Sequence, residues 1–311
     1  MQLRKATRTK SKLRIGLAGT SGSGKTYSAL LLASGMAAWD KIAVIDTENG
    51  SADLYTQLGE YNVITLQAPF SPERYIEAIK TCEDAGMEVI IVDSITHEWD
   101  GKGGCLEIIE QVTKASTSKN SYTAWAKVTP RHNAFVQAIL QSSAHVITTV
   151  RRKQDYSMDK NDQGKTVVTK AGLKEVTRDG FEYELTLSFA LSQNHLAEAS
   201  KDRTSLFMDK PEFVITAETG KLLKSWAEEG LDHLPVPMIT PDQIKLLHTL
   251  ITKKGADKAA LLDYFGVKSS KDLSEEQAAE AIKILQKRQD KPEMSDEETE
   301  KVVDSIPEDL E

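Results

Sequence analysis

Short apolar runs recur through the N-terminal third of the chain, and each ends at a turn or a carboxylate. Leu13–Ala18 leads into a glycine-rich turn, whereas Lys41–Asp46 and Glu88–Asp93 are rich in β-branched residues and each ends in aspartate. Runs without polar alternation are typical of parallel strands that are covered on both faces. The pattern therefore predicts a parallel sheet with polar side chains at its strand ends.

Helical patterns separate these runs. Thr26–Ala38 follows the glycine-rich turn, and Pro72–Ala85 follows Ser71, which is a candidate N-cap. His132–Gln141 precedes a further expected strand, Ala144–Val150. Because strands and helices alternate, we predict an α/β fold with a mostly parallel sheet.

The middle of the chain changes character after this strand. Arg151–Arg178 is polar and rich in Lys, Asp and Gly, which predicts a long loop or a hairpin. Phe181–Leu191, Ala197–Phe207 and Glu212–Thr216 have the composition of strands. We expect these three segments to form an antiparallel extension of the sheet.

A proline-rich segment separates the rest of the chain. Three prolines within Leu234–Pro241 interrupt both helix and sheet, which indicates a linker. Amphipathic spacing in Pro241–Lys254, Lys258–Phe265 and Glu275–Arg288 predicts a small helical module, and the acidic tail after it is expected to be disordered. The predicted division is a basic arm 1–12, an α/β core 13–232, a linker 233–241, the helical module 242–289 and the tail 290–311.

Composition adds limits. The chain has 40% hydrophobic and 28% charged residues, which is ordinary for a globular protein, and no apolar run approaches the ~18 residues of a membrane helix. Cys82 and Cys105 have no metal-binding spacing and indicate no disulfide framework. These features predict a cytoplasmic protein without a membrane partner.

Charge is distributed unevenly. Glu293–Glu311 holds nine acidic residues and one lysine, so it carries 1 − 9 = −8, which equals the net charge of the whole chain. The remaining body is therefore neutral, yet residues 1–14 hold six basic and no acidic side chains, and residues 111–145 hold no acidic side chain. Such local basic segments are compatible with contact to phosphates.

The glycine-rich turn carries the strongest motif. Residues Gly19–Thr26 read GTSGSGKT and satisfy the phosphate-binding pattern G-x-x-x-x-G-K-[ST] between a strand and a helix. Glycines allow backbone amides to face phosphate oxygens, and the following helix adds the positive end of its dipole. We predict that the motif residues bind ATP, with Lys25 on the β- and γ-phosphates and the Thr26 hydroxyl on Mg²⁺. The motif residues are Gly19, Thr20, Ser21, Gly22, Ser23, Gly24, Lys25 and Thr26.

Carboxylates at neighbouring strand ends complete the expected site. Asp93 fits the second magnesium carboxylate, directly or through water, and a capping role is its alternative. Glu48 and Glu98 are both candidates for orienting the attacking water. His97 is a further fallback, although a structural role is commoner for a lone histidine.

The segment Ile45-Asp-Thr-Glu48 resembles the RecA recombinase family, whose strand ends in I-D-A-E and carries the catalytic glutamate. Ala52–Gly59 is similar to the family's D-x-x-Y-A-x-x-L-G, and Val92–Ile95 to its V-D-S-V. The resemblance implies that Glu48 is the water-positioning base, while Asp46 packs or caps nearby. It also implies a RecA-like ATPase core.

Ser200-Lys-Asp-Arg-Thr204 resembles the family's K-N-K segment, whose cations reach the γ-phosphate of a neighbouring subunit. The resemblance implies that Lys201 and Arg203 act in trans and that the protein self-associates as a filament or ring. A solvated basic turn is the alternative.

Two segments occupy the positions of DNA-binding loops in RecA-like proteins. Residues 113–129 offer Lys114, Lys119, Lys127, Tyr122 and Trp125 for phosphates and stacking, and residues 151–178 are rich in lysine and arginine. Thr148-Thr149 stands where RecA ends its core strand with Asn-Gln. The communication between bound nucleotide and bound DNA in RecA is therefore not expected to carry over unchanged to this chain.

Over about residues 10–226 the chain is similar to small bacteriophage RecA-like nucleotide-binding ATPases, which share GTSGSGKT, VDSITHEW, RDGFEYE and SKDRT. This resemblance implies an oligomeric ATPase that binds DNA, most simply single-stranded DNA, in phage recombination or repair. The helical module resembles tails of phage recombination proteins, and the acidic tail is expected to bind a protein partner or compete with DNA. A helicase or packaging motor, or a small-molecule kinase, remains the alternative.

Overall fold

The computed structural model describes residues 5–116, 120–160, 166–231 and 238–288, without the side chains of residues 156–169 and 171. The chain divides into two compact units, Met1–Leu231 and Asp232–Glu311, which are described separately. The first unit is an α/β domain built on a mostly parallel sheet, so the predicted fold class is confirmed.

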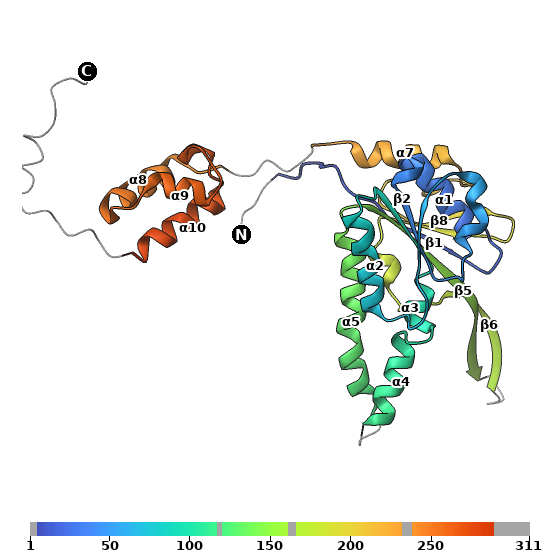
Figure 1. Ribbon diagram of the computed structural model, residues 1–311. Coiled ribbons are helices and arrows are strands. Elements are labelled where there is room, and N and C mark those ends of the chain that lie inside the picture. Colours follow the sequence, from blue (N-terminus) through green and yellow to red (C-terminus); the bar gives the residue numbers. More distant parts are fainter. Residues whose placement is uncertain (1–4, 117–119, 161–165, 232–237, 289–311) are drawn as a thin grey trace, which may run out of the picture. The chain divides into compact units, whose positions relative to one another are not determined.

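Nine strands form the sheet within the described residues, in the order β3-β2-β4-β5-β1-β7-β8-β9, with β6 paired to β5 (Figure 1). All pairings from β3 to β7 are parallel, whereas β7–β8, β8–β9 and β5–β6 are antiparallel. The strands are β1 (Arg14–Gly19), β2 (Ile42–Asp46), β3 (Asn62–Thr65), β4 (Val89–Asp93), β5 (His145–Lys160), β6 (Thr166–Glu175), β7 (Leu187–Leu191), β8 (Leu196–Asp202) and β9 (Phe213–Val214).

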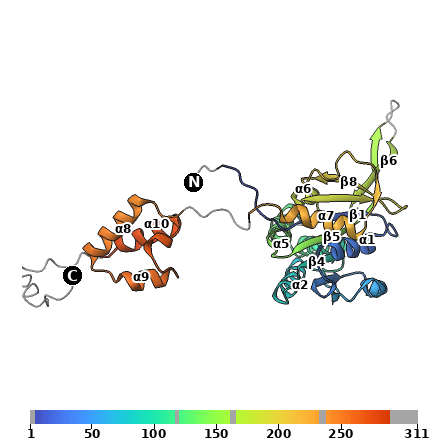
Figure 2. The same cartoon turned by 90° about the horizontal axis from the view of Figure 1, so that it is seen from above.

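Helices cover both faces of this sheet (Figures 1 and 2). Alternate residues of the central strands separate into two cores: Val44 packs with α1 and α7 on one face, and Ile45 packs with α2 and α5 on the other. Both faces are buried, which explains the continuous apolar runs. The helices of this unit are α1 (Lys25–Met36), α2 (Pro72–Asp84), α3 (Thr96–Asp100), α4 (Cys105–Ala115), α5 (Ser121–Gln141), α6 (Phe181–Glu184) and α7 (Ala217–Glu228), with 3₁₀ turns η1 (Trp39–Lys41) and η2 (Ala52–Leu58).

Two glycines let α1 and α7 approach closely. A Cβ on Gly35 would lie 2.0 Å from the carbonyl oxygen of Ala217, and a Cβ on Gly220 would lie 2.1 Å from that of Leu32. These contacts are with backbone, which cannot move aside easily, so neither position admits a side chain without a shift of the helix. This close packing fixes α1, the helix that begins at the glycine-rich turn, against α7.

Two basic residues of the N-terminal segment have structural partners. Arg8 donates to the carbonyl of Trp226 (2.6 Å), lies over its ring and pairs with Glu229 (2.9 Å). Arg14 is buried and donates to carbonyls at the end of α5, including those of Leu140 and Ser142. Burial lowers the pKa of Arg14 to about 10, which leaves it charged at neutral pH.

The prediction of a loop at residues 113–129 is wrong. Residues 113–115 end α4, and α5 begins at Ser121 instead of His132, with Asn120 as N-cap accepting from the Tyr122 amide (2.9 Å). A proline usually interrupts a helix, yet α5 continues through Pro130. The apolar face that packs against α4 outweighs this local preference.

Three other element predictions are corrected. Arg151–Arg178 contains a hairpin formed by the extended β5 and by β6, so the hairpin alternative was right and the loop was not. Phe181–Glu184 is the helix α6, and only Leu187–Leu191 is a strand. β8 stops at Asp202, because its carboxylate accepts from the amides of Thr204 (2.6 Å) and Phe207 (2.8 Å) and forms a turn.

The second unit contains the three predicted helices, α8 (Pro241–Lys254), α9 (Lys258–Tyr264) and α10 (Glu275–Gln286), and a 3₁₀ turn η3 (Ser270–Asp272). Thr240 with Gln243, and Ser274 with Gln277, form capping boxes at the starts of α8 and α10. The helices enclose a separate core around Leu247, Leu273 and Ala278. The expected linker lies partly, and the acidic tail wholly, outside the described residues.

Among the helices of the described residues, none combines the length and the apolar character that a membrane crossing requires.

Candidate nucleotide-binding site

The glycine-rich turn joins β1 to α1, as the motif requires. Gly22 (φ 79°) and Gly24 (φ 84°) have left-handed backbone conformations that residues with a Cβ rarely adopt. Gly24 is also the N-cap of α1, so the turn leads directly into the first amides of the helix, which have no partner within the helix and form its positive end. This is a cradle for an anion formed by backbone alone.

Lys25 lies in this cradle. Its Nζ donates to the carbonyl oxygen of Thr20 (2.9 Å), and its side chain is partly buried. Burial lowers the pKa of Lys25, the charge of Asp93 opposes that shift, and Arg151 adds to it. Two cations near the same partly buried position favour an anionic ligand there.

Asp93 lies at the end of β4 beside the first turn of α1. Its Oδ2 accepts from the Thr26 hydroxyl (2.6 Å), and its Oδ1 accepts from the Thr149 hydroxyl. Burial raises the pKa of Asp93, while the hydrogen bonds from Thr149 and Thr26 oppose this shift. A hydroxyl and a carboxylate in contact are oxygen ligands of the kind that Mg²⁺ takes, so these residues fit the ion.

Glu48, the predicted water-positioning base, follows the neighbouring strand β2. Its Oε1 accepts from the Ser94 hydroxyl (3.0 Å) and from Nε of Arg151 (2.9 Å), and its Oε2 accepts from the second guanidinium nitrogen. The side chain is 19% exposed and borders the same cavity as Lys25. Its carboxylate therefore borders the cavity of the glycine-rich turn while it is paired with Arg151.

The expected capping role of Asp46 is confirmed. Its carboxylate accepts from the amides of Glu48 (2.6 Å) and Ala52 (2.9 Å). These bonds fix the turn between β2 and η2, and that turn presents Glu48 to the cavity.

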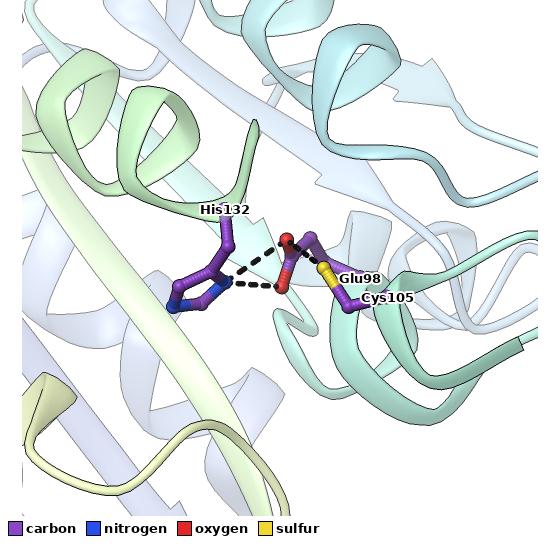
Figure 3. A group of neighbouring side chains, drawn as sticks. All are labelled: Glu98, Cys105 and His132. Atoms are coloured by element: carbon purple, nitrogen blue, oxygen red, sulfur yellow. Dashed lines mark hydrogen bonds and ion pairs between the residues drawn. The ribbon is translucent and has the colours of Figure 1, made fainter. Parts of the chain in front are cut away.

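The fallback residues lie elsewhere. Glu98 has no exposed surface and contacts Cys105 and His132 (Figure 3). His97 bonds to the Thr47 hydroxyl (2.8 Å) and stacks on Phe70, and burial lowers its pKa. Neither side chain borders the cavity of the glycine-rich turn, which favours Glu48 over both.

The cavity itself has a volume of about 190 Å³. Apart from the motif, it gathers residues at or just after the ends of β2 and β4, residues of η2 and its N-cap, and Arg151, which lies within β5 opposite Gly19, the last residue of β1. Its lining is formed by Ser21, Gly22, Gly24, Lys25, Thr26, Glu48, Ser51, Tyr55, Asp93 and Arg151.

Sequence reasoning missed three residues of this site. Arg151 is predicted only as part of a DNA-binding segment, and the structure also pairs it with Glu48 in the cavity. Thr149 was noted only as a departure from RecA, and it holds Asp93. Gln193, in the turn after β7, donates to the Thr20 hydroxyl and to the carbonyl of Ser21 (3.1 Å), and no local signal could have placed it there.

Lys201 and Arg203 lie outside the cavity lining of their own chain. Nζ of Lys201 donates to the carbonyl of Glu182 (2.9 Å), and a guanidinium nitrogen of Arg203 donates to that of Tyr183 (2.9 Å). Both cations thus cap the last turn of α6, which is a favourable position for positive charge. Burial, and then the charge of Arg203, lowers the pKa of Lys201.

The two expected DNA-binding segments form projections. In the view of Figure 1 the α4–α5 pair and the β5–β6 hairpin both extend below the body of the first unit. Tyr122 is 79% exposed on α5, whereas Trp125 is partly buried and packs against Trp99. Lys114 pairs with Glu110 (2.5 Å), Lys127 is exposed, and Lys119 lies outside the described residues.

Comparison with known proteins gives a family. Residues 11–217 match the family described as AAA domain, which covers more than half of the chain. No curated protein sequence matches. A solved structure described as a prototypical ATPase from the type III secretion system of pathogenic bacteria is 15% identical over 88% of this chain and 79% of that chain, with a TM-score of 0.35. That score is too low to support any conclusion.

Proposed function

The chain belongs to the AAA domain family, and from this premise we propose that it is a Mg²⁺-dependent ATPase whose hydrolysis is stimulated by single-stranded DNA. The observation that carries the proposal is one cavity that joins Lys25, the Thr26–Asp93 pair and Glu48. Phosphate binding, metal binding and water activation need these three groups at one place.

Each group has a role in this reaction. The amides of the glycine-rich turn and Lys25 bind the triphosphate, and Thr26 with Asp93 holds Mg²⁺. When bound, the ion neutralises negative charge on the phosphates. Glu48 orients the attacking water. Tyr55 offers an aromatic ring at the edge of the cavity, on which the adenine ring of ATP can stack.

Two variants test the ATPase proposal. Lys25→Ala should lose nucleotide binding, whereas Glu48→Gln should bind ATP and hydrolyse it about 10²–10⁴-fold more slowly, because only the base is removed. Binding is measured with a fluorescent ATP analogue, and turnover by phosphate release. If Lys25→Ala binds normally, or if Glu98→Gln and not Glu48→Gln stops turnover, the assignment is wrong.

The pairing of Arg151 with Glu48 supports stimulation by DNA. Arg151 continues directly into the β5–β6 hairpin, one of the two projections proposed to bind DNA. A guanidinium that holds both carboxylate oxygens keeps Glu48 from a water. We propose that DNA bound to the hairpin breaks the ion pair between Arg151 and Glu48, which frees the Glu48 carboxylate to bind the attacking water.

The projection formed by α4 and α5 is the second proposed DNA contact. Its sequence from residue 111 to 145 lacks acidic residues, and Tyr122 stands exposed on it. Stacking on a base contributes about 1–3 kcal/mol.

Tyr122→Ala should therefore weaken binding of single-stranded DNA by roughly 5–150-fold, because a loss of 1–3 kcal/mol corresponds to that ratio. Tyr264→Ala is the matched control, since Tyr264 is 71% exposed but lies in the other unit. Fluorescence anisotropy with and without ATP, at several salt concentrations, measures the effect. Equal affinities for both variants would contradict a contact at Tyr122.

The biological setting rests on the resemblance to phage RecA-like ATPases. We propose recombination or repair by an oligomer, in which Lys201 and Arg203 leave the carbonyls of α6 and reach the nucleotide of a neighbouring subunit. A motor would use the same ATP site, and a kinase would transfer phosphate to a metabolite. DNA-stimulated hydrolysis without such transfer distinguishes the proposal from a kinase, and absence of unwinding distinguishes it from a helicase.

A further inference from the structure

A second group of reactive side chains is buried between α3, α4 and α5. Glu98 and Cys105 have no exposed surface, and His132 is 3% exposed. Figure 3 shows the three side chains directed toward one another. Nδ1 of His132 lies 3.1 Å from both carboxylate oxygens of Glu98, and Sγ of Cys105 lies 3.1 Å from Oε1.

The local fold enforces this meeting. The turn between α3 and α4 is so tight that a Cβ on Gly101 would lie 2.5 Å from the carbonyl oxygen of His97. A Cβ on Gly104 would lie 2.7 Å from the carbonyl oxygen of Glu98. The turn therefore returns Cys105 to Glu98, and α5 supplies His132 from a distant part of the sequence.

We propose that Glu98, Cys105 and His132 form a structural zinc site. Their ligand atoms all lie within 4.8 Å of one another. Around a tetrahedral zinc ion with bonds of about 2.0–2.3 Å, ligand atoms are separated by roughly 3–4 Å. Both oxygens of Glu98 face the histidine, so the carboxylate would occupy one corner of a distorted tetrahedron, with the thiolate and the imidazole at two others.

The donor set selects the metal. Thiolate and imidazole suit Zn²⁺, whereas Mg²⁺ and Ca²⁺ prefer oxygen ligands. Binding replaces the proton of the Cys105 thiol by the ion and releases that proton to solvent, with no change of oxidation state. Zn²⁺ with one carboxylate, one thiolate and a neutral imidazole has no net charge, which suits a buried position.

The metal-free cluster is also a hydrogen-bonded arrangement. Burial and the nearby Glu98 carboxylate raise the pKa of Cys105, so without a metal the thiol keeps its proton and donates to Glu98. A bound zinc ion would convert it to a thiolate. The protonation state of this sulfur therefore distinguishes the two arrangements.

The site would act as a clamp. Glu98 follows β4 closely, whereas Cys105 and His132 belong to the helices of the α4–α5 projection. The ion would tie this projection to the strand end that carries Asp93. It shares no residue with the proposed ATP site, so either proposal can fail without the other.

The test uses the full-length wild-type chain, refolded with Zn²⁺ or with Co²⁺ and then passed over a desalting column. Mass spectrometry should find about one equivalent of zinc, as for a single closed site. The cobalt protein should show thiolate-to-cobalt charge-transfer absorption. Zn²⁺ misplaced at Thr26 and Asp93 would give no such band, because no thiolate is there. Zinc below a tenth of an equivalent together with no cobalt band would overturn the proposal.

The two cysteines provide a matched pair of variants. Cys82 and Cys105 are both buried and are the only cysteines of the sequence. Cys105→Ser should lose the cobalt band, whereas Cys82→Ser should keep it, with folding checked by circular dichroism. A band that survives in Cys105→Ser would assign the thiolate elsewhere and reject the site. Should Cys105→Ser not fold, the wild-type zinc content and cobalt spectrum still decide.

Discussion

At the scale of single residues, the proposed magnesium site depends on neighbours as much as on the ligand. Asp93 is 2% exposed, and burial disfavours its charge. The hydroxyls of Thr26 and Thr149 oppose that effect, one on each carboxylate oxygen. Thr149 therefore orients the carboxylate and opposes the rise in its pKa.

Thr149→Val should raise the Mg²⁺ concentration for half-maximal ATPase activity by about 10–100-fold, the usual effect of losing a group that orients a metal ligand. Thr148→Val is the control. Thr148 is equally buried, but its hydroxyl donates to the carbonyl of Ile15 and not to Asp93. Magnesium titrations of the two variants give the comparison, and identical midpoints would show that Thr149 does not support the ligand.

At the scale of elements, β1 and β5 are joined at their beginnings by a buried histidine. Nδ1 of His145 accepts from the Leu13 amide (3.0 Å), which requires an unprotonated nitrogen. Burial lowers the pKa of His145 to about 3, and the charges of Lys12 and Arg14 add to this shift. The folded protein therefore holds this side chain neutral in mildly acid solution.

This pKa shift predicts acid sensitivity. The unfolded histidine has a pKa of about 6.5, so it takes up a proton below that pH while the folded His145 stays neutral. The free energy of unfolding is therefore unaffected by this group above pH 6.5 and decreases as the pH falls toward 3. His145→Asn, whose amide oxygen can accept from Leu13, should remove the dependence, which amounts to about 3 kcal/mol at pH 4. Urea unfolding at pH 7 and pH 4 measures it. Parallel losses of stability in both proteins would refute a neutral His145.

The α4–α5 pair shows how packing overrides local signals. Pro130 favours a helix boundary, yet buried Ala124 and Val128, on the turns before it, pack against α4. The helix therefore begins at Ser121, and an expected loop becomes a helical projection. Its exposed Tyr122 and its partly buried Trp125 could be distinguished only after this packing was known.

At the scale of the whole molecule, the proposed trans action requires subunits to meet. Lys201 and Arg203 do not line the cavity of their own chain and are bound to carbonyls of α6. If a neighbour's nucleotide recruits them, a dilute monomer lacks two cations that stabilise charge on the transferred phosphoryl group.

ATP turnover per subunit should therefore rise with protein concentration and reach a plateau once oligomers form. The variant Lys201→Ala/Arg203→Ala should stay at the low rate throughout, while it still binds ATP. Sedimentation velocity on the same samples relates rate to assembly. A rate that is constant down to monomeric dilution would exclude trans action.

The sequence by itself determined the strand–helix alternation, the phosphate-binding turn and the three helices of the second unit, because these depend on local periodicity and on backbone conformations that favour glycine. It also indicated the order of the carboxylates along the chain. Only the tertiary structure decided which of them share a cavity, because Glu48 and Asp93 come from the ends of the paired strands β2 and β4, and Arg151 comes from within the neighbouring strand β5. For the same reason it separated Glu48 from Glu98, whose partner His132 lies 34 residues away along the chain. Contacts between distant segments follow from packing, and no local pattern encodes them.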